Sequence, residues 1–151
     1  MVANLGLHNQ PIEILLIEDN PGDVRLIKEI FKENSMENHV AVVRDGVEAM
    51  AYLYRLGHYS NVNRPDMVLL DLNLPRKDGR SVLSEIKTDP DLQSIPVIVL
   101  TSSDAEEDIR HAYELHANCY IAKPVDFEQL LKVIRLLNEF WFTVVKLPPR
   151  I

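Results

Sequence analysis

The stretch MVLLDLNLP, residues 67–75, decides how the rest of the chain is interpreted. Its first four residues are apolar without alternation, which is typical of a strand that is buried on both faces of a parallel sheet. An acidic residue, Asp71, comes directly after this strand. The residues after each similar strand are therefore candidates for a site, because α/β proteins bind ligands at the carboxyl ends of their parallel strands.

Four further apolar runs have the same form, and they cover residues 14–17, 40–43, 97–100 and 119–122. The segments between the runs repeat apolar residues at helical spacing, with starts near Asn20, Asp45, Gly79, Ser103 and Asp126. Strands that alternate with helices indicate a parallel sheet with helices on both faces. We predict an α/β fold in three layers, built on a doubly wound five-stranded parallel sheet.

Local signals define the expected helix starts and one loop. Asn20 precedes Pro21, which is typical of an N-cap followed by the first helical residue. Ser103 and Glu106 have the spacing of a capping box, so we expect Ser103 to cap a helix that continues to about residue 115. The polar stretch 57–64 is interpreted as a long surface loop.

Composition limits the class of protein. The chain has 151 residues, of which 46% are hydrophobic and 26% charged, as expected for one globular domain. We predict a domain over residues 12–140, preceded by a flexible arm, residues 1–11, and followed by a tail, residues 141–151.

Charge and targeting signals limit the partners. The net charge is −7 and the basic residues are scattered, so we expect no nucleic-acid partner. No apolar run approaches the roughly 20 residues that cross a bilayer, and no secretory signal is evident, so we expect no membrane association. A single cysteine, Cys119, fits a cytoplasmic location.

The chemistry is expected where the strands end. Polar side chains come after four of the five strands: Glu18-Asp19, Asp71, Thr101 and Lys123. Crowded carboxylates are stable as anions mainly when a hard cation lies among them, and Mg²⁺, or Mn²⁺ in its place, suits oxygen ligands of this kind. Asp71 could then attack a phosphoryl group and form an aspartyl phosphate, with Lys123 neutralising the added charge. Thr101 could donate a hydrogen bond to the phosphoryl group.

Three other functions fit the sequence less well. Each residue alone has an ordinary structural explanation, but four accidents would not place these residue types after the right strands. An aspartyl-phosphate hydrolase would need an acid two residues after its nucleophile, where this chain has Asn73. A flavin binder would need a phosphate cradle after the first strand, where Glu18-Asp19 would repel the phosphate. A phosphate-independent scaffold would not need the whole set.

These motifs also carry a family resemblance. The chain resembles response-regulator receivers over about residues 12–140, through Glu18-Asp19-Asn20, residues 70–75 with Asp78-Gly79, Thr101-Ser102 and residues 120–124. The resemblance implies the flavodoxin-like strand order 2-1-3-4-5 and phosphorylation of Asp71 by a sensor histidine kinase. It also implies Mg²⁺ ligation by Asp19, Asp71 and the Asn73 carbonyl, with Glu18 acting through water.

The same resemblance assigns the remaining site residues. Lys123 would pair with the phosphate, and the peptide bond between Lys123 and Pro124 would be cis. Thr101 and Tyr120 would form the switch pair that reports phosphorylation to a partner. The protein would then be a phosphoacceptor signalling protein rather than an enzyme, although it would assist its own phosphotransfer and dephosphorylation.

A narrower resemblance suggests the kinase. The segments 57–59, 113–120, 140–141 and 147–148 are similar to those of small receivers paired with cyanobacterial phytochromes, which implies a phytochrome-type kinase. One departure from receivers in general is His116, where glycine commonly ends the fourth helix in a left-handed conformation.

The last helix suggests a second partner. It is apolar beyond the one face that a sheet can cover, at Leu131, Val133, Leu136, Phe140, Trp141 and Phe142. We expect a homodimer that forms through the fourth helix, the fifth strand, the fifth helix and the tail. The alternative is that the tail folds back and covers this surface within one monomer.

Overall fold

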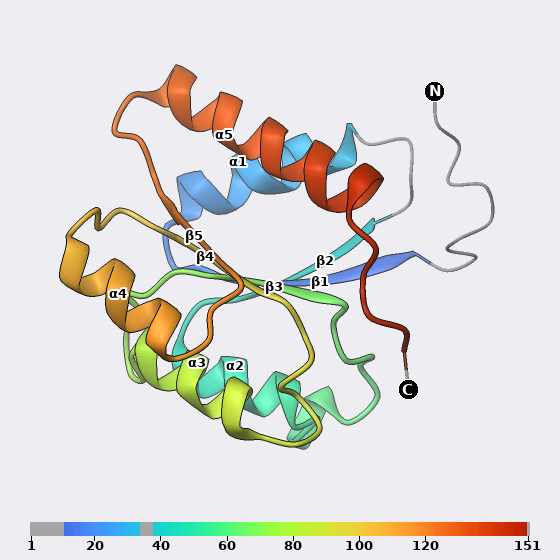
Figure 1. Cartoon of the computed structure of the whole chain (residues 1–151). Helices are drawn as coiled ribbons and strands as arrows, with labels where there is room; N and C mark the ends of the chain where they lie inside the picture. The colour runs from blue at the N-terminus through green and yellow to red at the C-terminus, as the bar shows by residue number, and fades with distance from the viewer. Residues whose placement is uncertain (1–10, 34–37, 151) are drawn as a thin grey trace.

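The computed structural model describes residues 11–33 and 38–150 (Figure 1). Its five strands are β1 (Ile12–Ile17), β2 (Asn38–Val43), β3 (Met67–Leu70), β4 (Val97–Thr101) and β5 (Cys119–Ala122). All neighbouring strands are parallel, in the order β2-β1-β3-β4-β5. The predicted fold class and strand order are therefore confirmed. The predicted arm lies outside the described residues except for Pro11.

The helices form the outer two layers. One face of the sheet is covered by α1 (Pro21–Lys32) and α5 (Phe127–Glu139), and the other by α2 (Gly46–Leu53), α3 (Gly79–Thr88) and α4 (Glu106–Glu114) (Figure 1). Alternate residues of β1 belong to two separate cores, with Leu15 and Ile17 on the α2–α3 side and Ile14 and Leu16 on the α1–α5 side. Burial on both faces explains why the strands are continuously apolar.

The strand register sets the position of the candidate site. Ile17 pairs with Leu70, and Leu70 pairs with Val99, so β1, β3 and β4 end at a common edge. Glu18 and Asp71, the next residues along two of these strands, must therefore lie at that edge. The close packing of α3 also fixes the chain at Asp71, since a Cβ on Gly79 would overlap the Asp71 carbonyl oxygen.

The predicted helix starts are confirmed with one exception. The Asn20 side chain caps α1 by accepting from the Asp23 N–H at 3.0 Å, as predicted. In α4, however, the N-cap is Ala105, so the predicted Ser103 capping box is wrong. The Ser103 hydroxyl donates to Asp108 at 2.5 Å, and its oxygen accepts from the Ala105 N–H at 3.3 Å, so Ser103 lies in the turn that precedes α4 and not at its N-cap.

The loops give three further outcomes. The predicted loop 57–64 contains a short 3₁₀ helix, η1 (Gly57–Tyr59). His116 has φ of 73°, so the left-handed residue expected after the fourth helix is present. The peptide bond between Lys123 and Pro124 is trans, since no cis bond occurs in the described residues, and the predicted cis bond is wrong. The trans isomer is favoured for X–Pro bonds by about 0.5–1 kcal/mol.

The C-terminal segment packs against the domain. α5 passes into one π-helical turn, η2 (Phe140–Val144), and the chain then runs toward the amino ends of the strands (Figure 1). Phe142 is buried and packs edge-on against Phe31 with ring centroids 5.2 Å apart. Leu147 is buried in the same core. Phe142 therefore belongs to the monomer core, as in the alternative in which the tail folds back, and it is not part of an exposed partner surface.

None of the helices in the described ranges has the length and apolar composition needed to cross a membrane.

Candidate functional site

The three predicted acids come together at the carboxyl edge of the sheet. Glu18 and Asp71 are buried, Asp19 is exposed, and one carboxylate oxygen of each lies within 4.8 Å of the others. Two of these acids extend β1 and the third extends β3, so the topology alone brings them together. The chemistry of this donor set fits a hard divalent cation, which prefers carboxylate oxygens.

Asp71 is held by two hydrogen bonds on one oxygen. The Thr101 hydroxyl donates to Asp71 Oδ1 at 2.7 Å, and the backbone N–H of Asn73 donates to the same oxygen at 3.1 Å. Thr101 is fully buried at the end of β4, so its hydroxyl has a fixed partner. Asp71 Oδ2 is left facing the cation Lys123 at 3.5 Å. One oxygen is therefore anchored and the other is available for chemistry.

Lys123 follows β5 and is shared among three acids. Its Nζ donates to Glu18 Oε1 at 2.6 Å and to Asp23 Oδ2 at 2.9 Å, both closer than Asp71. Asp23 was not predicted as a site residue. Its position in the first turn of α1, four residues after Asp19, was the available signal. Because Asp23 and Glu18 hold the ammonium group, Lys123 would have to shift to meet a group attached to Asp71.

The pKa values reflect a shortage of positive charge. Burial raises the pKa of the Glu18 carboxyl to about 7, and the ammonium of Lys123 offsets this effect only in part. Burial alone would lower the pKa of Lys123, but its hydrogen bonds to Glu18 and Asp23 outweigh burial and raise that pKa. Lys123 therefore stays charged, and it is shared among more carboxylates than it can neutralise.

Tyr120 lies outside this cluster. Its hydroxyl donates to the Ser103 carbonyl oxygen at 2.9 Å, in the loop between β4 and α4. The same serine donates to Asp108, which pairs with Arg80 at 3.0 Å. A chain of polar contacts thus joins β5, the β4–α4 loop and α3, and sequence reasoning missed Arg80 and Asp108. Neither residue belongs to a recognisable motif, so no signal was available.

Comparison with known proteins identifies relatives that match almost the whole chain. A profile of the response regulator receiver domain matches residues 14–135. Response regulator Rcp1 of Synechocystis sp. is 48% identical over 140 residues, covering 93% of this chain and 95% of Rcp1. The probable methanogenesis regulatory protein FilR2 of Methanothrix harundinacea is 43% identical over 131 residues, covering 87% of this chain and 84% of FilR2.

Two solved structures share the fold. The phosphorylated cyanobacterial phytochrome response regulator RcpA has a TM-score of 0.90 and 51% identity, covering 93% of this chain and 100% of RcpA. The Mn²⁺-bound form of response regulator Rcp1 also has a TM-score of 0.90, at 47% identity, covering 92% of this chain and 100% of Rcp1.

Proposed function

This chain belongs to the response-regulator receiver family, and from that premise we propose that it accepts a phosphoryl group on Asp71 from a sensor histidine kinase. The observation that carries the proposal is the environment of Asp71. One oxygen is anchored by Thr101 and Asn73, and the other lies 3.5 Å from Lys123. A buried carboxylate with one free oxygen beside a cation suits nucleophilic attack on phosphorus.

The reaction forms one bond and breaks another. Asp71 Oδ2 attacks the phosphorus of a phosphohistidine, a new P–O bond forms, and the P–N bond breaks with the electron pair returning to the imidazole. The phosphoryl group adds negative charge beside Lys123, which moves from Glu18 and Asp23 toward it. The Thr101 hydroxyl turns from Asp71 Oδ1 to a phosphoryl oxygen, and Tyr120 responds as the other half of the switch.

A divalent cation completes the proposed site. Asp19, Asp71 and the Asn73 carbonyl would hold Mg²⁺ or Mn²⁺, with Glu18 acting through water. The excess of carboxylates over cations supports this, as does the Mn²⁺-bound structure of the relative Rcp1. When bound, the cation would neutralise charge on the phosphoryl oxygens.

Mass spectrometry tests the acceptor residue. With a small-molecule phosphodonor and Mg²⁺, the wild type should gain one phosphoryl adduct, and Asp71→Asn should gain none. Asp104→Asn, which changes an exposed acid in the nearby β4–α4 loop, is the matched control and should react as the wild type does. An adduct on Asp71→Asn that peptide mapping does not assign to a neighbouring hydroxyl would overturn the proposal.

We further propose that the kinase is of the phytochrome type and that the pair works in the cytoplasm. The support for the phytochrome pairing is similarity, since RcpA is a cyanobacterial phytochrome response regulator and is 51% identical to this chain. Phosphotransfer from autophosphorylated phytochrome kinases should be faster than from unrelated histidine kinases at equal concentration. Equal rates for both groups would remove the specific pairing and leave the acceptor assignment intact.

The homodimer remains part of the proposal, with a revised contact surface. On α5 and η2, the side chains of Val133, Leu136, Phe140 and Val144 fall on one helical stripe, and the last three are more than half exposed. Such an apolar stripe on the outside of a domain suits a second copy of the chain. Light scattering should give a dimer for the wild type and a monomer for Leu136→Asp. Phe127→Asp changes an equally exposed residue off the stripe and should stay dimeric.

A further inference from the structure

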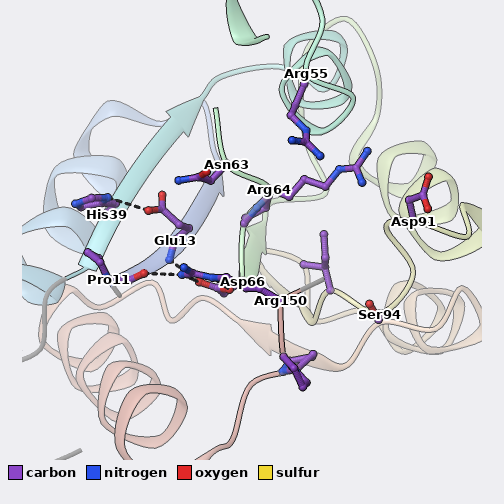
Figure 2. Close-up of a pocket in the computed structure, with 14 residues that line it drawn as sticks. Pro11, Glu13, His39, Arg55, Asn63, Arg64, Asp66, Asp91, Ser94 and Arg150 are labelled. Carbon is purple, nitrogen blue, oxygen red and sulfur yellow. Dashed lines mark hydrogen bonds and ion pairs between the residues drawn. The ribbon is translucent and has the colours of Figure 1, made fainter. Parts of the chain in front are cut away.

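A concavity lies at the amino edge of the sheet, at the other end of the strands from Asp71. It is lined by the starts of β1 and β2, by residues that precede β3 and β4, by Arg55 after α2 and by the C-terminal segment (Figure 2). Its volume is about 610 Å³. This is the size of a small-molecule site. Its apolar walls include Pro65, Ile95, Pro148 and Pro149.

Most charges around this pocket are paired within the protein. Glu13 contacts the His39 ring at 2.9 Å, and Arg150 Nε donates to Asp66 Oδ1 at 2.8 Å. Arg150 also donates to the Pro11 carbonyl at 2.6 Å, which ties the C-terminal wall of the pocket to the start of β1 (Figure 2). These contacts build the pocket and leave little of their charge for a ligand.

Two guanidinium groups are not paired in this way. Neither Arg55 nor Arg64 forms an ion pair with any residue of the described ranges. Arg64 Nε donates to the Leu53 carbonyl at 3.4 Å, which brings its side chain to the end of α2, where Arg55 follows. Figure 2 shows both guanidinium groups directed to the same side of the pocket, with the carboxylate of Asp91 farther along the wall.

The backbone conformation of Arg55 also indicates a binding role for this residue. Arg55 has φ of 58°, in the left-handed region, immediately after the C-cap of α2. The Leu56 N–H bonds to the Ala51 carbonyl at 2.9 Å, so this turn is the kind of helix end at which glycine is the usual residue. An arginine in this conformation is unfavourable for the backbone. Residues held in such conformations concentrate at binding sites, where the side chain has a use.

We propose that this pocket binds a small organic anion through an oxyanion group, either a phosphate monoester or a carboxylate. Arg55 and Arg64 would hold the oxyanion, because guanidinium groups match its planar or tetrahedral oxygens. The proline side chains of the wall and Ile95 would contact the organic part of the ligand. The pocket is larger than a lone inorganic anion requires. Asp91 would disfavour a second negative charge at the far end. The site is independent of phosphorylation at Asp71.

Amide chemical shifts locate and measure the binding in metal-free buffer. Phenyl phosphate and benzoate are the two oxyanion probes. Inorganic phosphate is the control that carries the charge without an organic group, and benzyl alcohol is the control that carries the aromatic ring without a charge. At least one oxyanion probe should shift the amides of Asn63, Ser94 and Arg150 in a saturable way, and should leave those of Asp71 and Thr101 unchanged. The stronger probe identifies the oxyanion class.

Arg55→Gly is the decisive variant, because glycine suits the left-handed backbone and the protein should fold normally. Loss of one charge-assisted contact should weaken the probe about tenfold. Arg76→Gly is the matched control, because Arg76 has φ of 68° and does not line the pocket. An unchanged affinity in Arg55→Gly overturns the proposal. So does a lack of saturable shifts, or inorganic phosphate binding as tightly as phenyl phosphate, which would mean an adventitious ion only.

Discussion

The two edges of the same sheet treat charge in opposite ways. At the carboxyl edge, Glu18, Asp19 and Asp71 cluster within 4.8 Å, and the one lysine among them is shared. At the amino edge, Asp66 has its own arginine, Arg150.

The comparison shows that the two ends of a parallel sheet can carry different roles, one in binding and the other in holding the chain together. Negative charge is left incompletely compensated where a cation and a phosphoryl group are proposed to bind. At the amino edge the acids Glu13 and Asp66 have partners within the protein, and Arg55 and Arg64 form no ion pair within the described ranges.

Burial sharpens this difference. The Lys123 side chain is 9% exposed, whereas that of Arg150 is 38% exposed. An uncompensated charge costs more when it is buried, because water cannot replace the missing partner. Lys123 at the carboxyl edge should therefore contribute more to the free energy of unfolding than Arg150 at the amino edge.

The largest expected effect tests whether the amino edge depends on the C-terminal segment. Phe142→Ala should lower the free energy of unfolding by about 4 kcal/mol, as large-to-small changes of buried aromatic residues do. Phe142 is 4% exposed and packs against Phe31, whereas Phe127 of α5 is 61% exposed and lies off the proposed dimer stripe. Phe127→Ala is therefore the matched control and should change stability little. Urea unfolding measures both, and equal effects would mean that the segment does not dock.

The next effect tests the comparison directly. Without divalent cations, Lys123→Ala should lower the free energy of unfolding by about 3 kcal/mol, because Glu18 and Asp71 lose their buried partner. Arg150→Ala should lower it by only about 1 kcal/mol, because the ion pair with Asp66 is partly solvated.

The effect of Mg²⁺ on stability should also differ between variants at the two edges. Lys123→Ala should still bind Mg²⁺, since an ammonium group is no ligand, and the added cation should restore part of the lost stability. Arg150→Ala should show the same Mg²⁺ response as the wild type. Thermal unfolding with and without Mg²⁺ measures both responses. A folded Lys123→Ala protein that gains no stability from Mg²⁺ would contradict the assigned role of the lysine.

The sequence predicted the carboxyl edge better than the amino edge, for a physical reason. Parallel strands place their carboxyl ends together, so Glu18, Asp71 and Lys123 could be assembled from strand positions alone. No such rule applies to side chains that meet by packing. The docking of Phe142 was therefore expected only as an alternative, and the arginine pocket was not foreseen.

Competition between polar groups limited the remaining predictions. Ser103 has the spacing of a capping residue, but its hydroxyl donates to Asp108 and accepts from the Ala105 N–H, two local partners that the capping pattern does not include. Asp23 likewise contacts Lys123 across 100 residues of sequence. Side chains with more than one possible partner cannot be assigned until the tertiary positions of those partners are known.

A smaller effect concerns the β4–α4 loop at the carboxyl edge, which is held by polar contacts. Arg80 contacts Asp108, which accepts from Ser103, whose carbonyl accepts from Tyr120. Removing Arg80 should loosen this loop and let Thr101 turn toward a phosphoryl group more readily. Arg80→Ala should speed phosphorylation by a small-molecule donor roughly two- to fivefold, the scale of a partly exposed ion pair. Arg110→Ala, which removes an exposed arginine of α4, should not change the rate.

The smallest effect has the opposite sign and belongs to the amino edge. Arg55→Gly should raise the free energy of unfolding by about 0.5 kcal/mol, because glycine removes the left-handed penalty of roughly 1 kcal/mol but increases the entropy of the unfolded chain. Arg76→Gly makes the same change at φ of 68° but also loses an ion pair with Asp45, so its gain should be smaller. Urea unfolding of the two variants gives the difference. A loss of stability in Arg55→Gly would mean that the arginine stabilises the fold itself, and its conformation would then need no ligand to explain it.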